Sequence, residues 1–148
     1  MRIALAADHA GYQLKDELAG WLREIGYEVH DLGTNSADSV DYPHFGAKLA
    51  HAIATGVADR GIVVCGSGIG ISIAVNREPK CRCARVDEPI SAALAREHND
   101  ANVIALGARL LGPDMAKACV AAFLGADFAG GRHQRRVDQL STPLQDSD

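Results

Sequence analysis

The sequence lacks the long apolar runs and the basic excess that mark membrane proteins and nucleic-acid-binding proteins. None of its apolar runs approaches the roughly 20 residues that a membrane-spanning helix needs. Its first residues do not have the layout of a signal peptide, so we expect a cytoplasmic protein. The net charge of -4 provides no general excess of cations to displace counterions from nucleic acid. We therefore expect neither a membrane nor a nucleic acid as a partner.

Cysteines are few, and their spacing matches no common metal or redox pattern. The four cysteines, at 65, 81, 83 and 119, form neither a CxxC pair nor a zinc spacing. Cys81 and Cys83 would share one face of a strand, but no second pair and no nearby histidine completes a metal site. We therefore expect mainly buried, structural thiols and no bound metal. A thiol-redox role for Cys81 and Cys83 is the weakest alternative function.

The pattern of apolar residues predicts a single α/β domain. Apolar content of 47 % and charged content of 23 % are ordinary for a globular protein. Strand-like and helix-like segments alternate five times with short links, which is typical of a three-layer α/β/α, Rossmann-like fold. We predict a five-stranded parallel sheet and a C-terminal helix, in one domain over residues 1–148 with a flexible tail after about residue 140. The predicted strands are residues 3–7, 27–32, 62–64, 81–86 and 102–106.

A glycine-rich turn follows the third predicted strand, and Cys65 stands where the strand becomes the turn. Glycines at 66, 68 and 70 allow the backbone to turn sharply and to approach a ligand closely. The helix that begins there directs its free N–H groups at an anion and favours the thiolate form of a nearby cysteine. The stretch therefore offers a nucleophile or base beside a positively polarised hole. An inert, buried thiol is the competing interpretation of Cys65.

Three known loop motifs do not fit this turn. A dinucleotide-binding GxGxxG pattern that starts at Gly66 needs glycine or alanine where Ile71 stands. A phosphate-binding P-loop ends in Gly-Lys followed by Ser or Thr, which the turn lacks. A thiol phosphatase loop would need arginine, again at position 71. What remains is a thiol beside main-chain donors. Aldose–ketose isomerisation needs this equipment: a base for the proton beside a carbonyl and donors for the enediolate.

Polar residues elsewhere could join Cys65 at the carboxyl edge of the sheet. Ligands of parallel sheets bind beyond the strand ends where strand order reverses. Asp8 and His9 would therefore share a crevice with Cys65 if the first and third strands are neighbours. Either residue could instead cap the following helix. His98 could shuttle a proton near neutral pH, or could be a surface histidine at a helix end.

Arginines near the C-terminus form the strongest local charge signal. Arg132 and Arg136 are four residues apart and would share one helical face. Like charges repel at that spacing unless an anion such as phosphate compensates them. Arg109, just after the fifth predicted strand, is a further candidate for the same anion. A solvated basic helix face is the alternative.

Five segments, spread over nearly the whole chain, carry a resemblance to a known family. They are Ala7-Asp8-His9-Ala10-Gly11, Asp41-Tyr42-Pro43, Cys65-Gly66-Ser67-Gly68-Ile69-Gly70-Ile71-Ser72, His98-Asn99-Asp100-Ala101-Asn102-Val103 and Gly130-Gly131-Arg132-His133. In this order they closely resemble the ribose-5-phosphate isomerase B family, which also includes allose- and galactose-6-phosphate isomerases.

The resemblance implies a role for the glycine turn. Cys65 looks like the base that moves a proton between C1 and C2 of the sugar. Another branch of the family uses a glutamate where this chain has Ile71, so the chain resembles the cysteine branch. Ser67 would relay a proton between the two oxygens. Main-chain amides of the turn would form the anion hole, and they include those of Gly66, Gly68, Ile69 and Gly70.

The resemblance also implies how the sugar phosphate is held. Asp8 and His98 would assist opening of the sugar ring, while Tyr42 and Asn99 would hold sugar hydroxyls. Family members are dimers or tetramers whose site borrows residues from the neighbouring subunit, so part of the phosphate clamp should come from a second chain. No cofactor is implied. The phosphate clamp would consist of His9, Arg109, Arg132 and Arg136.

These residues favour a cofactor-free isomerase that interconverts ribose 5-phosphate and ribulose 5-phosphate. Residues 79–89 are unusually polar for a fourth strand and lie beside the site. Allose 6-phosphate, galactose 6-phosphate and a tetrose phosphate are therefore alternative substrates. A phosphosugar-binding module without catalysis is the alternative from another class. Binding alone would need no base, which argues for the enzyme because Cys65, Ser67 and His98 occur together.

Overall fold

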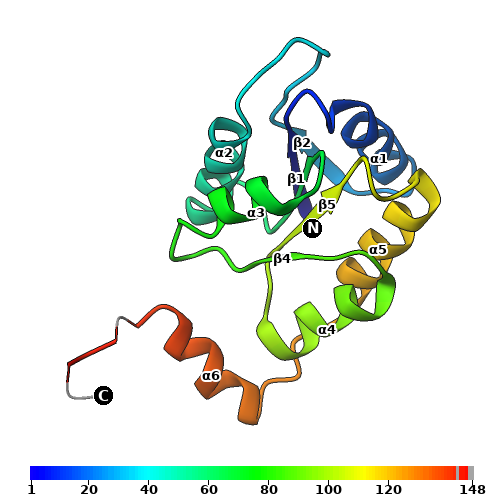
Figure 1. Ribbon diagram of the computed structural model, residues 1–148. Coiled ribbons are helices and arrows are strands. Elements are labelled where there is room, and N and C mark those ends of the chain that lie inside the picture. The colour runs from blue at the N-terminus through cyan, green and yellow to red at the C-terminus, as the bar shows by residue number, and fades with distance from the viewer. Residues whose placement is uncertain (143, 147–148) are drawn as a thin grey trace.

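A parallel sheet of five strands organises the part of the chain that the computed structural model describes, residues 1–142 and 144–146 (Figure 1). The strand order is β2-β1-β3-β5-β4, and each neighbouring pair is parallel. The predicted α/β class and the C-terminal helix are confirmed. The strands are β1 (Arg2–Ala7), β2 (Glu28–Asp31), β3 (Arg60–Cys65), β4 (Cys83–Arg85) and β5 (Val103–Gly107). The helices are α1 (Tyr12–Glu24), α2 (Tyr42–Ala54), α3 (Ile69–Val75), α4 (Pro89–Asn99), α5 (Pro113–Gly125) and α6 (Arg132–Leu140).

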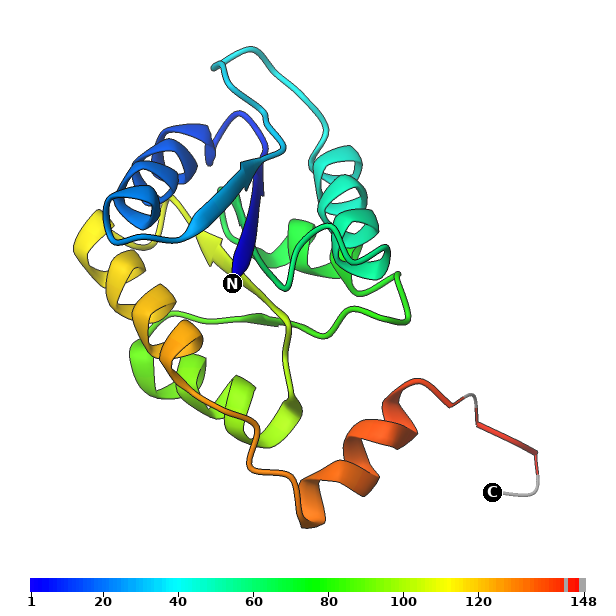
Figure 2. The ribbon, with the colours of Figure 1, turned by 180° about the vertical axis from the view of Figure 1, so that it is seen from behind.

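Helices cover both faces of the sheet, which makes three layers (Figures 1 and 2). Helices α1, α4 and α5 pack on one face, where Leu18 and Phe123 belong to the same buried cluster as Leu5 of β1. Helices α2 and α3 pack on the other face, where Leu49 shares a cluster with Val63 of β3. Because both faces are covered, the central strands are continuous apolar runs instead of alternating ones.

Strand order reverses between β1 and β3. Strand β1 pairs with β2 on one side and with β3 on the other, so the chain leaves the middle of the sheet in both directions. The loops after β1 and β3 therefore start side by side, and the Asp8 N–H donates to the Val64 carbonyl oxygen at 3.2 Å. The condition for the predicted crevice, that the first and third strands are neighbours, is met, and it places both loops at the carboxyl edge of the sheet.

The fourth strand is shorter than the predicted 81–86 because side chains replace part of its ladder. Strand β4 spans only three residues, at the edge of the sheet. Just before it, the Asn102 side chain accepts from the Arg82 N–H and donates to the Lys80 carbonyl, both at 2.8 Å, in place of ladder hydrogen bonds. Cys81 lies in a turn, where its N–H donates to the Glu78 carbonyl. The prediction that Cys81 and Cys83 share a strand face is therefore wrong.

Helix α6 extends away from the sheet and contacts α4 (Figure 1). Beyond it, Ser141 Oγ donates to the Pro79 carbonyl oxygen at 3.2 Å. The tail predicted to be flexible includes residues 143 and 147–148, which lie outside the described residues. Within the described ranges, none of the helices combines the length and the apolar character that a bilayer span requires.

Candidate active site

Loops after β1, β3 and β5 meet at the carboxyl edge of the sheet, and glycines allow their close contact. A Cβ on Gly11 would lie 2.5 Å from the Val64 carbonyl oxygen. A Cβ on Gly107 would lie 2.7 Å from the Ser67 carbonyl oxygen. Gly68 has a φ of +77°, which other residues rarely adopt. The three loops therefore pack into one corner that no larger residue at these positions would permit.

The Cys65 side chain is held by the glycine turn that follows it. The residue is 4 % exposed, and its Sγ accepts a hydrogen bond from the Gly68 N–H at 3.1 Å. Main-chain donors at the start of a helix stabilise negative charge on a sulfur. The sulfur is therefore placed where a thiolate base would be held, and its role as a base stays a prediction.

The turn uses some of its amides for its own structure. The Gly68 N–H donates to Cys65 Sγ, and the Ile69 N–H donates to Ser67 Oγ at 3.1 Å. The N–H groups of Gly66 and Gly70 find no acceptor among the described residues. Since Ser67 Oγ already accepts one hydrogen bond, its own proton is the group left to donate to a ligand. Two of the four amides predicted for the anion hole thus shape the turn, and two are left for a ligand.

Tyr42 and Arg109 pack on two glycines of the turn. A Cβ on Gly70 would lie 2.8 Å from the Tyr42 ring, and a Cβ on Gly66 would lie 3.0 Å from Arg109 Nη1. Tyr42 reaches this place because α2 begins there, with Asp41 as its N-cap and a proline in its first turn. The phenol and the guanidinium therefore flank the turn from which the predicted sugar contacts would be made.

Asp8 and His9 are held by hydrogen bonds to the backbone. Asp8 is 8 % exposed, and its Oδ1 accepts from the N–H groups of Ala10 and Gly11 at 3.0 and 3.1 Å. This carboxylate shapes the turn before α1 and uses one oxygen to do so. His9 Nδ1 lies 3.1 Å from the Val40 N–H. The same Nδ1 lies 3.2 Å from the Val40 carbonyl oxygen, so the Val40 backbone holds this edge of the ring and Nε2 is left to face a ligand.

Arg85 was not predicted as a site residue, yet it braces the glycine turn from β4. Its Nε donates to the Ser67 carbonyl oxygen at 2.8 Å, and its Nη1 donates to Asp87 at 3.0 Å. The planar guanidinium thereby fixes the peptide that follows Ser67. The sequence signal for this contact was the unusual polarity of residues 79–89.

Helices α4 and α6 form a second surface, which carries other predicted residues. Helix α4 starts beyond the carboxyl end of β4 and runs back, so His98 and Asn99 lie near the amino end of β5. The His98 ring stacks on the His133 ring of α6, with centroids 4.4 Å and planes 12° apart. Asp100, the C-cap of α4, accepts a hydrogen bond from Arg96 Nη1 at 2.8 Å. This ion pair fixes the corner that presents His98 and Asn99.

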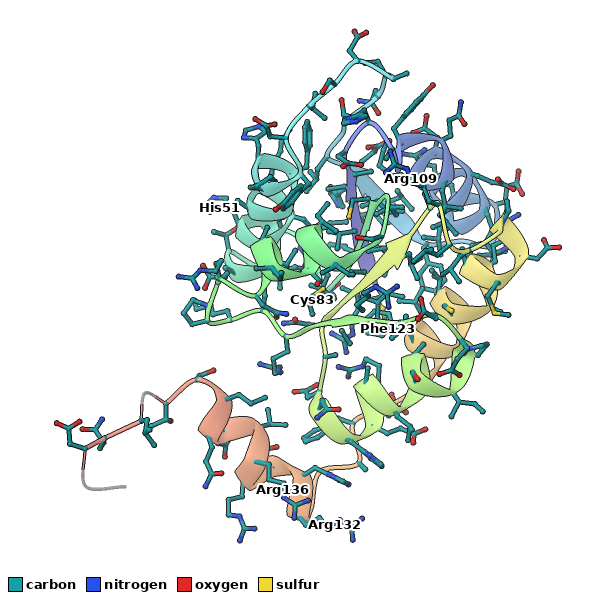
Figure 3. The ribbon with its side chains drawn as sticks, in the orientation of Figure 1. His51, Cys83, Arg109, Phe123, Arg132 and Arg136 are labelled. Carbon is teal, nitrogen blue, oxygen red and sulfur yellow. The ribbon has the colours of Figure 1, made fainter. Side chains whose placement is uncertain are left out.

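The predicted site residues thus fall into two groups. Figure 3 shows Arg132 and Arg136 at one end of the molecule and Arg109 at the other. One chain therefore does not assemble the whole predicted set, which is the arrangement that a site shared between subunits requires. We name the group at the carboxyl edge (Asp8, His9, Tyr42, residues 65–70 and Arg109) the cysteine half-site, and the group on α4 and α6 (His98, Asn99, Arg132 and Arg136) the arginine half-site.

Positive charge gathers in the arginine half-site. Desolvation lowers the pKa of His133, and the neighbouring His98, Arg132 and Arg136 lower it further. The same field that disfavours an added proton there favours an anion. A cavity of about 350 Å³ lies beside this half-site and not at Cys65; Asn99 is among its lining residues. Asn99 is the residue of the half-site that lines this cavity, so the cavity adjoins the basic surface without being formed by its arginines.

The remaining thiols do not support a redox function. Burial raises the pKa of Cys81 to about 11 and also raises the pKa of Cys83. Burial raises the pKa of Cys119 to about 11 as well. Such thiols keep their protons at neutral pH and are inert. Among the described residues, no three His, Cys, Asp or Glu side chains gather as a metal-ligating group.

Comparison with known proteins identifies the family. The family model described as Ribose/Galactose Isomerase matches residues 3–140. Ribose-5-phosphate isomerase B of Escherichia coli (strain K12) is 48 % identical over 140 residues, which cover 95 % of this chain and 94 % of the relative. The structure of ribose-5-phosphate isomerase B from Clostridium thermocellum matches with a TM-score of 0.94 and 50 % identity over 95 % of each chain. The structure of the enzyme from Mycoplasma genitalium with bound ribulose 5-phosphate matches with a TM-score of 0.91 and 37 % identity, over 95 % of this chain and 93 % of that one. The chain belongs to the ribose/galactose isomerase family, and the predicted resemblance to ribose-5-phosphate isomerase B is confirmed.

Proposed function

We propose that the chain is a sugar-phosphate isomerase that interconverts ribose 5-phosphate and ribulose 5-phosphate. The observation that carries the proposal is the placement of Cys65 Sγ at the carboxyl edge, 3.1 Å from the Gly68 N–H and inside a turn with further free amides. The family membership supports it, and a related enzyme has been described with ribulose 5-phosphate bound. Residues 1–148 would act as one isomerase domain without a cofactor.

The proton transfer uses Cys65 and Ser67. The Cys65 thiolate removes the C2 proton of the open-chain aldose, and the electron pair of that C–H bond moves toward the C1 carbonyl to give an enediolate. Ser67 passes the O2 proton to O1. The thiol then returns its proton to C1, so C2 becomes the carbonyl of the ketose and no atom is gained or lost. The N–H groups of Gly66 and Gly70 stabilise the negative oxygen, which is usually the largest catalytic term.

The groups around this centre open the ring and hold the sugar. Asp8 uses one carboxylate oxygen for its turn, so the other can accept a proton from a ring hydroxyl. His98 supplies the complementary proton transfer, because an imidazole changes charge near neutral pH. Tyr42, packed on Gly70, and Asn99 bind sugar hydroxyls.

The phosphate is gripped by both half-sites, so two copies of the chain complete each site. His9 and Arg109 belong to the cysteine half-site, while Arg132 and Arg136 belong to the arginine half-site. The exposed apolar side chains of α3 support a homodimer, or a tetramer built from it, because Ile69 and Ile73 are 50 % and 60 % exposed beside the turn. A thiol base also favours the cytoplasm, where cysteines stay reduced.

An isomerase assay across sugar phosphates tests the proposal. We expect the largest kcat/KM with ribose 5-phosphate, unchanged by EDTA. A larger kcat/KM with allose 6-phosphate, galactose 6-phosphate or a tetrose phosphate would show that the proposed substrate is wrong and that the proposed reaction type is right. Tight binding of these compounds without turnover of any would instead favour a phosphosugar-binding module.

A further inference from the structure

An ammonium group is buried in α1, outside the catalytic set. The Lys15 side chain is fully buried, although it stands on the apolar face of the helix. Its Nζ lies 2.7 Å from both carboxylate oxygens of Asp31, 2.7 Å from Asp16 Oδ1 and 3.0 Å from Asn35 Oδ1. A buried charge is costly unless it is fully paired, and these acceptors satisfy the three hydrogens of the ammonium. A lysine therefore occupies a position on the apolar face of α1, where it holds the side chains of Asp16, Asp31 and Asn35 in place.

Two of these acceptors fix the start of the loop between β2 and α2. Asp31 ends β2, and its Oδ1 also accepts from the Gly33 N–H at 2.9 Å. The Gly33 carbonyl accepts from the Ala7 N–H at 2.7 Å, and the Thr34 N–H donates to the Ala7 carbonyl at 2.8 Å. Ala7 directly precedes Asp8 and His9. The anchored loop is thus joined to β1 at the point where β1 enters the site.

The other end of the same loop positions His9. The Val40 backbone holds His9 Nδ1, with its N–H at 3.1 Å and its carbonyl oxygen at 3.2 Å, which fixes the orientation of the ring. Between these two ends, residues 35 and 37–39 are exposed, and the loop rises away from the helices in Figure 1. Since no apolar core holds this segment, its polar anchors determine where Val40 lies.

We propose that Lys15 is a positioning residue that acts on phosphate binding through His9. By holding Asp31 and Asn35, it fixes the loop that places the Val40 backbone against His9 Nδ1 and so aims His9 Nε2 at the phosphate. This inference rests on the proposed function, in which His9 belongs to the phosphate clamp.

Steady-state kinetics of Lys15→Met and Asn35→Ala test the proposal. We expect KM for ribose 5-phosphate to rise about tenfold in Lys15→Met, the loss of roughly one charge-assisted hydrogen bond, with kcat changed by less than about threefold. Asn35→Ala keeps the buried charge pair, so a smaller rise in KM is expected with normal stability. Lys117→Met is the matched control, because this lysine pairs with Glu17 on the surface and does not contact the loop.

A double-mutant cycle with His9→Ala separates positioning from general damage. If Lys15 acts through His9, Lys15→Met raises KM by less than about twofold once His9 is alanine. The proposal would be overturned if Lys15→Met raised KM by the same factor in the His9→Ala background as in wild type. It would also be overturned if KM were unchanged in both Lys15→Met and Asn35→Ala. Should Lys15→Met fail to fold, the same cycle is run with Asn35→Ala. The ¹⁵N shifts of the His9 ring give a second measurement: they should differ from wild type in Lys15→Met and match wild type in Lys117→Met.

Binding of inorganic phosphate distinguishes a failure of this proposal from a failure of the proposed function. If the wild-type chain turned over no sugar phosphate, the function would be wrong. Calorimetry with inorganic phosphate would still test the role of Lys15. The proposal is supported if Lys15→Met binds phosphate about tenfold more weakly than wild type, and if the same substitution causes no such weakening when His9 is alanine. Equal weakening in both backgrounds refutes it.

Discussion

The cysteine half-site and the arginine half-site differ in the kind of structure that holds their functional groups. In the first, Cys65 and the glycine turn are packed backbone to backbone against neighbouring strands. In the second, long side chains project from helix ends, and Arg132 and Arg136 are exposed. Charge that develops on one oxygen during a proton transfer needs donors fixed in advance. A phosphate accepts hydrogen bonds from many directions, so mobile arginines can bind it.

This difference explains why one half can belong to another subunit. The donors of the glycine turn depend on contacts with β1 and β5 that only one continuous fold provides. The arginines need only arrive near the phosphate, which a helix on a neighbouring copy can achieve. The proposed function therefore assigns the proton transfer to the half-site with strict geometry, and part of the phosphate binding to the half-site that tolerates movement.

Removing the sulfur should have the largest effect, and it should fall on kcat. In Cys65→Ala we expect kcat to drop by about 100- to 10,000-fold, because a general base contributes about 10²–10⁴. Binding of inorganic phosphate, measured by calorimetry, should stay within about threefold because the arginine half-site is untouched. Cys119→Ala is the thiol control. Full activity in Cys65→Ala would remove this residue as the base.

Removing a guanidinium from the arginine half-site should act on KM instead. In Arg136→Ala we expect KM for ribose 5-phosphate to rise about 10- to 100-fold, because one charge-assisted contact to the phosphate is lost. Arg135→Ala, an adjacent exposed arginine outside the half-site, serves as the control. Equal effects of the two substitutions would mean that α6 contributes only a general positive field.

A methyl group added to the glycine turn should disturb the cysteine half-site without unfolding it. In Gly70→Ala the new Cβ would lie 2.8 Å from the Tyr42 ring, which must move. We expect kcat/KM to fall about tenfold, the equivalent of one lost ligand contact. Gly20→Ala in α1 has open space around its Cβ and should instead raise stability by about 0.5–1 kcal/mol. Unchanged kinetics in Gly70→Ala would show that Tyr42 is not a ligand contact.

The smallest effect concerns the charge state of His133. Desolvation and the neighbouring His98, Arg132 and Arg136 lower the pKa of His133, so this side chain is harder to protonate in the folded chain than in the unfolded chain. Stability should therefore rise with pH between the folded pKa and the unfolded value of about 6.5, and be unaffected by this group above it. NMR titration should show a higher pKa for His133 in Arg132→Ala/Arg136→Ala than in wild type. A pKa that did not move would mean that the two arginines do not contribute and that desolvation and His98 cause the shift.

Much of the cysteine half-site could be predicted from the sequence, because its elements are local. The apolar run before Cys65, the alternating glycines and the residues at the end of β1 are contiguous patterns, and parallel-sheet topology brings their ends together. The shortened β4 could not be predicted in this way. Its length depends on the Asn102 side chain, which binds the backbone of Lys80 and Arg82, and propensity does not report which side chain captures a backbone group.

Features that depend on contacts between distant segments could not be predicted from the sequence, for physical reasons. Lys15 lies at helical spacing from Leu18 and Leu22, so the sequence does show a charged residue on an apolar helix face. The sequence does not show its partner, because Asp31 lies on another element. Arg85 reaches from β4 past β5, which lies between them in the sheet, to the turn after β3. Separation of the two half-sites follows from the direction of α4, which only the assembled topology reveals.

Subunit complementation is the most direct test of a divided active site. Cys65→Ala and Arg132→Ala/Arg136→Ala are each crippled, but a mixed dimer of the two holds one site with both halves intact. After exchange of subunits, we predict recovery to about one quarter of wild-type activity, as random pairing in a symmetric dimer gives. Mixing Cys65→Ala with Ser67→Ala, which damage the same half-site, should recover none. No recovery in the first mixture, with exchange verified by mass spectrometry, would contradict the account.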